Sequence, residues 1–237
     1  MIVRAEHDTL FLIPQPDHAH LARRIMERSP AVAMLPRRDA IALAIGEHDN
    51  GWTEEDAAPI IVPSSGAIAD FVHIAVAVRQ RVWPRAIHRL SATPWAAALV
   101  AQHAITIYDR FRTDAAWTAF FADMESLRAR FVDAAGLTLP ELLADYPFVR
   151  LGDLISLSFC TGWTSEQHYS HWLVRAEGPR VIISSGVSPA LFGGSTVPIE
   201  IQARAVRARA FHSDADVRAA VNAAPTVTLR GEAVDRA

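Results

Sequence analysis

Apolar residues recur at helical spacing through most of the first 160 positions. Leu21 and Ile25 lie four residues apart, for example, and charged residues occupy the other side of the same segment. The segments predicted to be helical are 17–29, 37–49, 70–82, 94–110, 113–135, 138–146 and 149–160. Pro84 and Pro147 are expected to end or separate helices, because proline has no backbone N–H to donate.

The pattern changes after Thr161, where glycines and short alternating runs predict strands. The three clearest runs are 180–187, 196–211 and 225–234, and residues 8–14 predict a short strand or an apolar lead-in. We therefore expect a mainly α protein with a small β-rich C-terminal extension. The predicted division is a helical body at 1–160 and the extension at 161–237, packed on the body.

Composition excludes several classes of chemistry. The chain has 237 residues, is 51% hydrophobic and carries a net charge of −3, so it can bury a core and lacks the basic character of a nucleic-acid binder. All 23 basic residues are arginine, which excludes a Schiff-base or P-loop lysine. The single cysteine, Cys160, excludes a disulfide framework and a cysteine-based zinc site. No uncharged apolar run reaches ~18 residues, and the first residues do not resemble a signal peptide, so we expect a cytoplasmic protein without membrane contact.

Histidines and aspartates lie on or beside the apolar faces of several predicted helices. His48 continues the stripe of Ile41 and Ile45, and His103 shares a face with Leu99. The set that has this property is His18, His48, Asp49, His103 and Asp153. Each residue alone is commonly structural: a buried histidine can donate to a backbone carbonyl, and Asp153 can pair with Arg150. A carboxylate that faces a core is costly unless it is paired or bound to a metal, so the whole set predicts a metal site between helices.

The order of His18, the adjacent pair His48 and Asp49, and the distant Asp153 resembles the HD-domain superfamily of metal-dependent hydrolases. The chain is also similar to an uncharacterised bacterial family, domain of unknown function 3891. The segments that carry this second resemblance are QPDHAHLARRI, AIGEHDNGWTEEDAAP, WAAALVAQHAITIY and RLGDLISLSFCTGW. The superfamily resemblance implies an HD-like helical bundle in which those four residues bind the first metal ion.

The resemblance also implies roles for other residues. His103 takes the place of a later histidine that HD proteins with two metals use, and either His73 or His88 would complete a second site. Glu54 or Asp56 can act as a general base or orient a ligand histidine, or the acidic run can be a solvated helix start. From the local sequence, Trp52 can wall a small cavity, stack on a ring or pack on the core at a helix end, and Arg110 can pair with a phosphate or face solvent.

Three functions remain open at this point. The first is a metal-dependent hydrolase of a phosphoester or related small molecule, with His103, Glu54 and Asp56 as catalytic candidates. The second is an HD-like di-iron oxygenase, and the third is a non-catalytic metal-binding regulatory module. The expected cofactor is one or two divalent ions of Fe, Mn, Co, Ni or Zn, because imidazole and carboxylate ligands suit these metals. A small-molecule substrate and a homodimer, formed through an edge strand at 198–211, are the expected partners.

Overall fold

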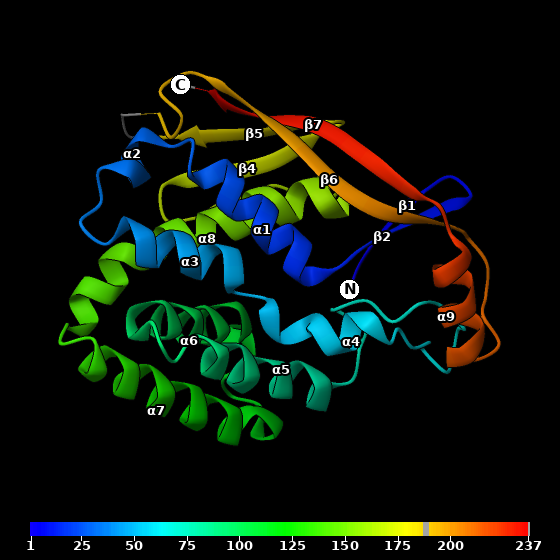
Figure 1. The fold of residues 1–237 in the computed structure, drawn as a ribbon, viewed down its shortest axis with the longest axis horizontal. Helices are drawn as coiled ribbons and strands as arrows, with labels where there is room; N and C mark the ends of the chain where they lie inside the picture. The colour runs from blue at the N-terminus through cyan, green and yellow to red at the C-terminus, as the bar shows by residue number, and fades with distance from the viewer. Residues whose placement is uncertain (187–189, 237) are drawn as a thin grey trace.

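The computed structural model describes residues 1–186 and 190–236, and it places a curled mixed sheet over a layer of helices (Figure 1). Seven strands form this sheet within the described residues, and all neighbouring strands are antiparallel except β5 and β7. Their order across the sheet is β1 (Ile2–Glu6), β2 (Thr9–Ile13), β6 (Thr196–Arg207), β7 (Thr226–Arg236), β5 (Arg180–Ser185), β4 (Trp172–Glu177) and β3 (Gln167–Tyr169).

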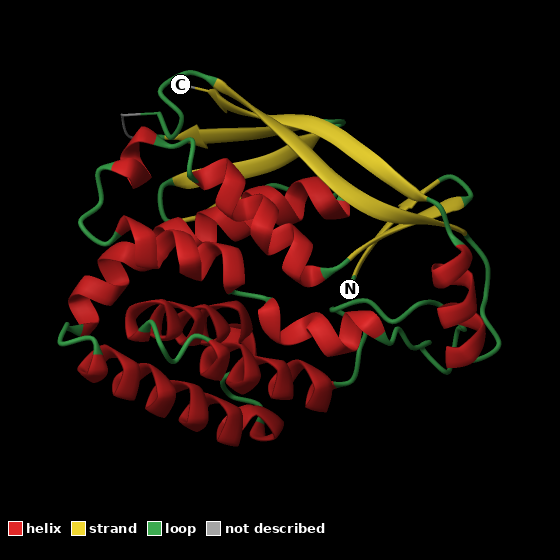
Figure 2. Ribbon diagram, viewed as in Figure 1, coloured by secondary structure: helices red, strands yellow, loops and turns green. Residues whose placement is uncertain are grey.

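The expectation of a mainly α, HD-like bundle with a small β-rich extension is wrong, and so is an all-α class. Figure 2 shows a sheet that runs along the whole upper side of the molecule. The N-terminal hairpin β1–β2 joins it, because β2 pairs with β6 from Thr9 opposite Arg207 to Leu12 opposite Arg204. Local periodicity does not reveal a pairing between such distant segments, so it cannot place the first strands in the same sheet as the last ones.

Strand β6 also lies in the interior of the sheet, between β2 and β7. The prediction that residues 198–211 form an edge strand is therefore wrong, while the homodimer itself stays a prediction. The strands at the two edges of the described sheet are β1 and β3. The alternating burial of β6 shows why its sequence predicts a strand so clearly: one face packs on the helices and the other is exposed.

The helices pack beneath the sheet, with α8 and α6 at the centre (Figure 1). Their bounds are α1 (Gln15–Met26), α2 (Pro30–Ala33), α3 (Arg38–Glu47), α4 (Thr53–Ala57), α5 (Val76–Arg89), α6 (Pro94–Tyr108), α7 (Thr118–Ala134), α8 (Leu139–Thr161) and α9 (Asp214–Ala223). Short 3-10 turns occupy Asn50–Trp52 (η1), Asp109–Phe111 (η2) and Ala115–Trp117 (η3). Helix α6 is buried around most of its circumference, as its apolar sequence PWAAALVAQHAITIY predicts. Among the described residues, no helix has both the length and the apolar character needed to cross a membrane.

Two prolines lie inside helices, contrary to the prediction that they end or separate them. Helix α5 continues through Pro84, and α8 continues through Pro147 as one helix of 23 residues. A proline removes one hydrogen bond to the carbonyl four residues earlier. For Pro147 that carbonyl belongs to Leu143, whose residue is 48% exposed, so water can take the place of the missing donor. The uninterrupted α8 matters because it carries Asp153 into the middle of the protein.

Candidate metal centre

His18 lies in the first turns of α1 and is buried under the neighbouring helices. Its Nε2 atom is 2.8 Å from Oδ2 of Asp49, and its Nδ1 atom is 3.0 Å from the hydroxyl of Ser156 on α8. That hydroxyl donates its only hydrogen to the backbone oxygen of Asp153, so it accepts a hydrogen from His18 Nδ1. The Nε2 atom of a neutral His18 therefore directs a lone pair at a carboxylate oxygen.

The adjacent pair His48 and Asp49 follows α3, where the chain turns into η1. His48 Nδ1 donates to the carbonyl of Ile45 over 2.8 Å, which fixes the tautomer of a neutral ring. The Nε2 atom of His48 is buried without a hydrogen-bond partner in the described part of the chain. It lies 3.6 Å from both Asp49 Oδ2 and Asp153 Oδ1. The Nε2 atom of His48 thus faces the carboxylates of both Asp49 and Asp153.

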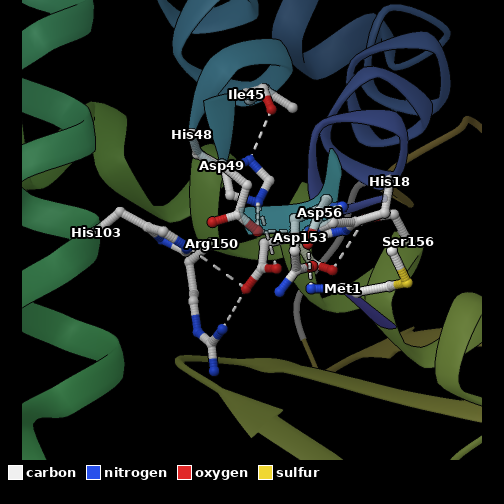
Figure 3. Close-up of polar contacts among 11 residues, drawn as sticks. Met1, His18, Ile45, His48, Asp49, Asp56, His103, Arg150, Asp153 and Ser156 are labelled. Atoms are coloured by element: carbon white, nitrogen blue, oxygen red, sulfur yellow. Dashed lines mark hydrogen bonds and ion pairs between the residues drawn. The ribbon is translucent and has the colours of Figure 1, made fainter. Parts of the chain in front are cut away.

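His103 on α6 and Asp153 on α8 complete the cluster (Figure 3). His103 Nε2 lies 3.6 Å from Asp153 Oδ2, while its Nδ1 atom is 3.2 Å from the hydroxyl of Tyr146. Arg150, one turn before Asp153, forms an ion pair with the same carboxylate oxygen. The spacing of Arg150 and Asp153 in the sequence is the signal that predicts this pair.

The structure brings together all five residues proposed as metal ligands, although they come from four separate segments. Two overlapping groups have ligand atoms within 4.8 Å of one another: His18, His48 and Asp49, and His48, His103 and Asp153. Every member is buried, and each imidazole has Nε2 toward the cluster and Nδ1 bonded away from it. Histidines that bind metals are held in the same way, by a partner on the other ring nitrogen.

The buried carboxylates and imidazoles of the cluster shift one another's pKa. Burial opposes the charged form of Asp49, yet His48 and His18 outweigh it and hold the pKa of Asp49 below its usual value. Burial also opposes ionisation of Asp153, but His48 and Arg150 keep its pKa far below the usual range. Burial disfavours a charged His48, and the two carboxylates reverse this and raise its pKa to about 9. Two anionic carboxylates therefore share either a protonated imidazole or a cation.

The donor set fits a divalent transition metal. Neutral imidazole nitrogens and carboxylate oxygens suit Fe, Mn, Co, Ni or Zn, and the buried Nε2 atom of His48 has no hydrogen-bond partner among the described residues. Burial lowers the pKa of His103 to about 3, so this ring is neutral at pH 7, as a ligand must be. His48 offers a single free nitrogen and belongs to both groups, so it can ligate only one ion.

The two histidines considered for a second metal site lie elsewhere. The side chain of His73 is 67% exposed and pairs with Asp70, and His88 is an exposed residue that contacts the carbonyl of Pro84. Neither belongs to the two groups of potential ligands found in the described residues. A second ion would therefore need ligands other than these two.

The acidic candidates for a general base also lie apart from the cluster. Glu54 is half exposed and forms ion pairs with Arg85 and Arg89 on α5. Asp56 is buried, but its carboxylate accepts from the backbone N–H of Gln15 over 2.5 Å and contacts the nitrogen of Met1 (Figure 3). Neither residue lines the cavity described next, so their catalytic role stays a prediction.

A cavity of about 310 Å³ opens beside the cluster and has His18, Asp49, His103 and Asp153 in its wall. Its aromatic lining residues are Trp52, Phe71, Trp83, Tyr108 and Trp163. Arg79, Arg110 and Arg150 are its cationic residues. Trp52 lines this cavity, as one of the possibilities drawn from the sequence has it, and Arg110 lies where it can contact an anionic group in the cavity. Sequence reasoning misses Arg79 and Trp83, because both lie in an amphipathic helix where nothing in the sequence distinguishes them from ordinary surface and core residues.

The chain matches the family described as protein of unknown function, DUF3891, over residues 1–208. This match covers most of the sequence, so the chain belongs to that family, and the resemblance stated from its motifs is confirmed. No curated protein and no solved structure matches the chain.

Proposed function

We propose that this member of the DUF3891 family is a metal-dependent hydrolase of a small phosphoester or a related small molecule. His18, His48, Asp49 and Asp153 are the proposed ligands of a divalent transition metal, with His103 as a further ligand or a contact for substrate or water. The observation that carries the proposal is the direction of three imidazoles: each has Nε2 toward one or both of the carboxylates of Asp49 and Asp153, which line the cavity, and Nδ1 bonded away from them.

The ion would act as a Lewis acid on a substrate oxygen and lower the pKa of a water molecule toward neutrality. The chain's own residues prepare for this chemistry. Ser156 and the carbonyl of Ile45 hold the rings of His18 and His48 in one orientation, so binding costs little rearrangement. His103 stays neutral. When its single proton is on Nδ1, next to the Tyr146 hydroxyl, its Nε2 atom is free to accept a hydrogen bond.

Arg150 has two roles in this proposal. It fixes the Asp153 carboxylate, and it also lines the cavity, where its remaining N–H groups can contact the anionic group that reacts. Apolar side chains such as Trp83 and Leu154 also line the cavity. Charge interactions are stronger in such surroundings than in water.

The order of the proposed ligands along the chain resembles that of the HD-domain superfamily, which supports metal-dependent chemistry at this site. The resemblance is confined to this ligand order, because the seven-stranded sheet differs from the all-helical bundle of that superfamily.

The first test is elemental analysis of the protein purified without added metal. We expect bound Fe, Mn, Co, Ni or Zn, and we expect the His48→Ala, Asp49→Ala double variant to lose it. His73→Ala is the matched control, since this histidine is exposed and outside the cluster. Unchanged metal content in the double variant would overturn the site assignment.

The second test is a screen for phosphate release from phosphomonoesters and phosphodiesters with Mn²⁺, Co²⁺ or Ni²⁺. We expect activity that Asp49→Asn abolishes while the variant keeps its circular dichroism spectrum. Iron that supports oxygen consumption without phosphate release would contradict hydrolysis. Bound metal with no turnover in either screen would instead indicate a non-catalytic module.

A further inference from the structure

Arg79 and Arg110 are cavity-lining arginines that form no ion pair with any carboxylate in the described chain. The other arginines of α5 behave differently, because Arg81 and Arg85 both pair with Glu55. The Nε atom of Arg79 is also buried without a hydrogen-bond partner among the described residues. A cationic side chain that lines a cavity and has no acidic partner can be satisfied by an anionic ligand.

Ring contacts hold both guanidinium groups in place without using their donors. The Cζ atoms of Arg79 and Arg110 lie 6.0 and 4.7 Å from the centre of the Phe111 ring, and Arg79 also lies 5.7 Å from Trp117. A stacked guanidinium uses its flat face, while its N–H groups lie in the plane and stay available. Both guanidinium groups line the same cavity with donors available, so either or both can bind an oxyanion there.

A series of aromatic rings connects this pair with the metal centre. The centre of the Trp83 ring is 5.8 Å from His103 and 6.1 Å from Tyr108, and Tyr108 is 6.4 Å from Phe111. The cavity lining thus includes the His/Asp cluster residues, the aromatic rings of Trp83 and Tyr108, and Arg79 and Arg110, which are separated from the cluster by those rings. Its volume of about 310 Å³ suits a small molecule.

We propose that Arg79 and Arg110 form an anion-binding subsite, which accepts a phosphate or carboxylate group on a part of the ligand away from the His/Asp cluster. The apolar part of the same ligand would lie against Trp83 and Ile107, which both line the cavity. As a statement about substrate, this inference rests on the proposed function and names its class: a small organic anion with an apolar or aromatic portion. The binding of the anion itself does not require the metal.

The test measures binding of phenylphosphonate, benzoate and the neutral benzamide to the full-length protein by isothermal titration calorimetry. It is done on the protein as purified and after removal of metal by a chelator, and the metal content of every sample is measured. We expect at least one of the two anions to bind in both forms and benzamide to bind at least tenfold more weakly. The preference between the two anions identifies the oxyanion.

The variants are Arg79→Gln, Arg110→Gln and the control Arg130→Gln. Arg130 is matched to Arg110, because it lies 4.7 Å from the centre of the neighbouring Phe131 ring and does not line the cavity. We expect each of the first two variants to raise the dissociation constant of the anion about tenfold or more, since a hydrogen bond to a charged group is lost. Arg79→Lys should keep part of the affinity, and Arg130→Gln should keep all of it.

Three results would overturn the subsite. They are equal affinity for benzamide and the anions, unchanged anion affinity in both Arg79→Gln and Arg110→Gln, and no binding of either anion to the folded protein. The outcome is separate from that of the proposed function. If the protein as purified holds no metal, anion binding that depends on Arg79 and Arg110 would still support the subsite, while the metal site of the proposed hydrolase would fail.

Discussion

His18 and Asp49 touch through Nε2 and Oδ2 at 2.8 Å, although one lies in α1 and the other follows α3. A shared proton or cation is needed between them, because the other nitrogen of His18 donates to Ser156. This contact makes Ser156 a positioning residue, since it determines which nitrogen of His18 faces the cluster.

Ser156→Ala should lower metal affinity by about 10- to 100-fold without removing any ligand. The substitution leaves the buried Nδ1 of His18 without its partner, so the ring loses both its tautomer and its orientation. Competition with a coloured chelator measures the affinity. Thr161→Ala is the control, because its hydroxyl also donates to a backbone carbonyl on α8 but does not contact the cluster. Equal affinities in the two variants would contradict the role of Ser156.

Gly51→Ala should destabilise the protein strongly. A Cβ at this position would lie 2.0 Å from the backbone oxygen of Val82 on α5, so the turn that carries Asp49 or the helix must move. We expect a loss of about 3 kcal/mol in the free energy of unfolding. The melting temperature should fall by about 10 °C, as measured by circular dichroism.

Gly136→Ala is the comparison for that variant. Gly136 has a φ of +65°, and no atom lies within 4 Å of the position that a Cβ would take there. Alanine at this position therefore adds backbone strain of about 1 kcal/mol without a clash. Similar melting temperatures for the two variants would show that α5 does not restrict position 51.

Glu55→Gln should lower stability near pH 7 and have little effect in acid. Hydrogen bonds from Arg81, together with Arg85, hold the pKa of Glu55 below its ordinary value of 4.5, although burial opposes them. The folded chain therefore binds the proton less readily than the unfolded chain. The stabilisation is complete above pH 4.5 and is lost as pH falls through the lower folded pKa.

Urea unfolding at pH 7 and at pH values below 4.5 measures this dependence. We expect a difference of about 1 kcal/mol between Glu55→Gln and the parent protein at pH 7, which shrinks in acid. Glu125→Gln serves as the control, because the Glu125 pair with Arg112 is exposed and should contribute little. A difference for Glu55→Gln that persists unchanged in acid would contradict the ion-pair explanation.

Cys160 should resist alkylation in the native protein. Its side chain is fully buried on α8, and burial raises the pKa of the thiol well above its usual range. Iodoacetamide should therefore label it only when the protein opens, so the labelling rate follows the opening reaction. Mass spectrometry measures the rate, and fast labelling of folded protein in the absence of denaturant would show that α8 is more accessible than its burial indicates.

The candidate ligands could be predicted from the sequence because each lies in a strong local pattern. His48 extends the apolar stripe of Ile41 and Ile45, and Asp153 interrupts one of the most apolar stretches of the chain. A polar residue at a position that must be buried requires a compensating partner, and several such positions indicate a shared one. The structure brings these side chains together, while the ion itself stays a prediction.

The sheet and the cavity could not be predicted in the same way. The pairing of β2 with β6 depends on residues far apart in the chain, and Pro147 suggests a helix end where α8 continues. Arg79 is a further example. It lies two residues from Arg81 in the same helix, and only the tertiary structure shows that Glu55 pairs with Arg81 while Arg79 lines the cavity. Local patterns carry no information about such partners.

The attachment of the N-terminal hairpin to β6 affects how the protein is made. A ribosome releases β2 and α1 early, but the strand that pairs with Thr9 is complete only after Arg207 has been translated. Until then the hairpin has an unpaired edge, and long-range pairing of this kind slows folding. The edge of β2 should therefore stay exposed in nascent chains until late in synthesis, when transient exposure of this kind favours aggregation.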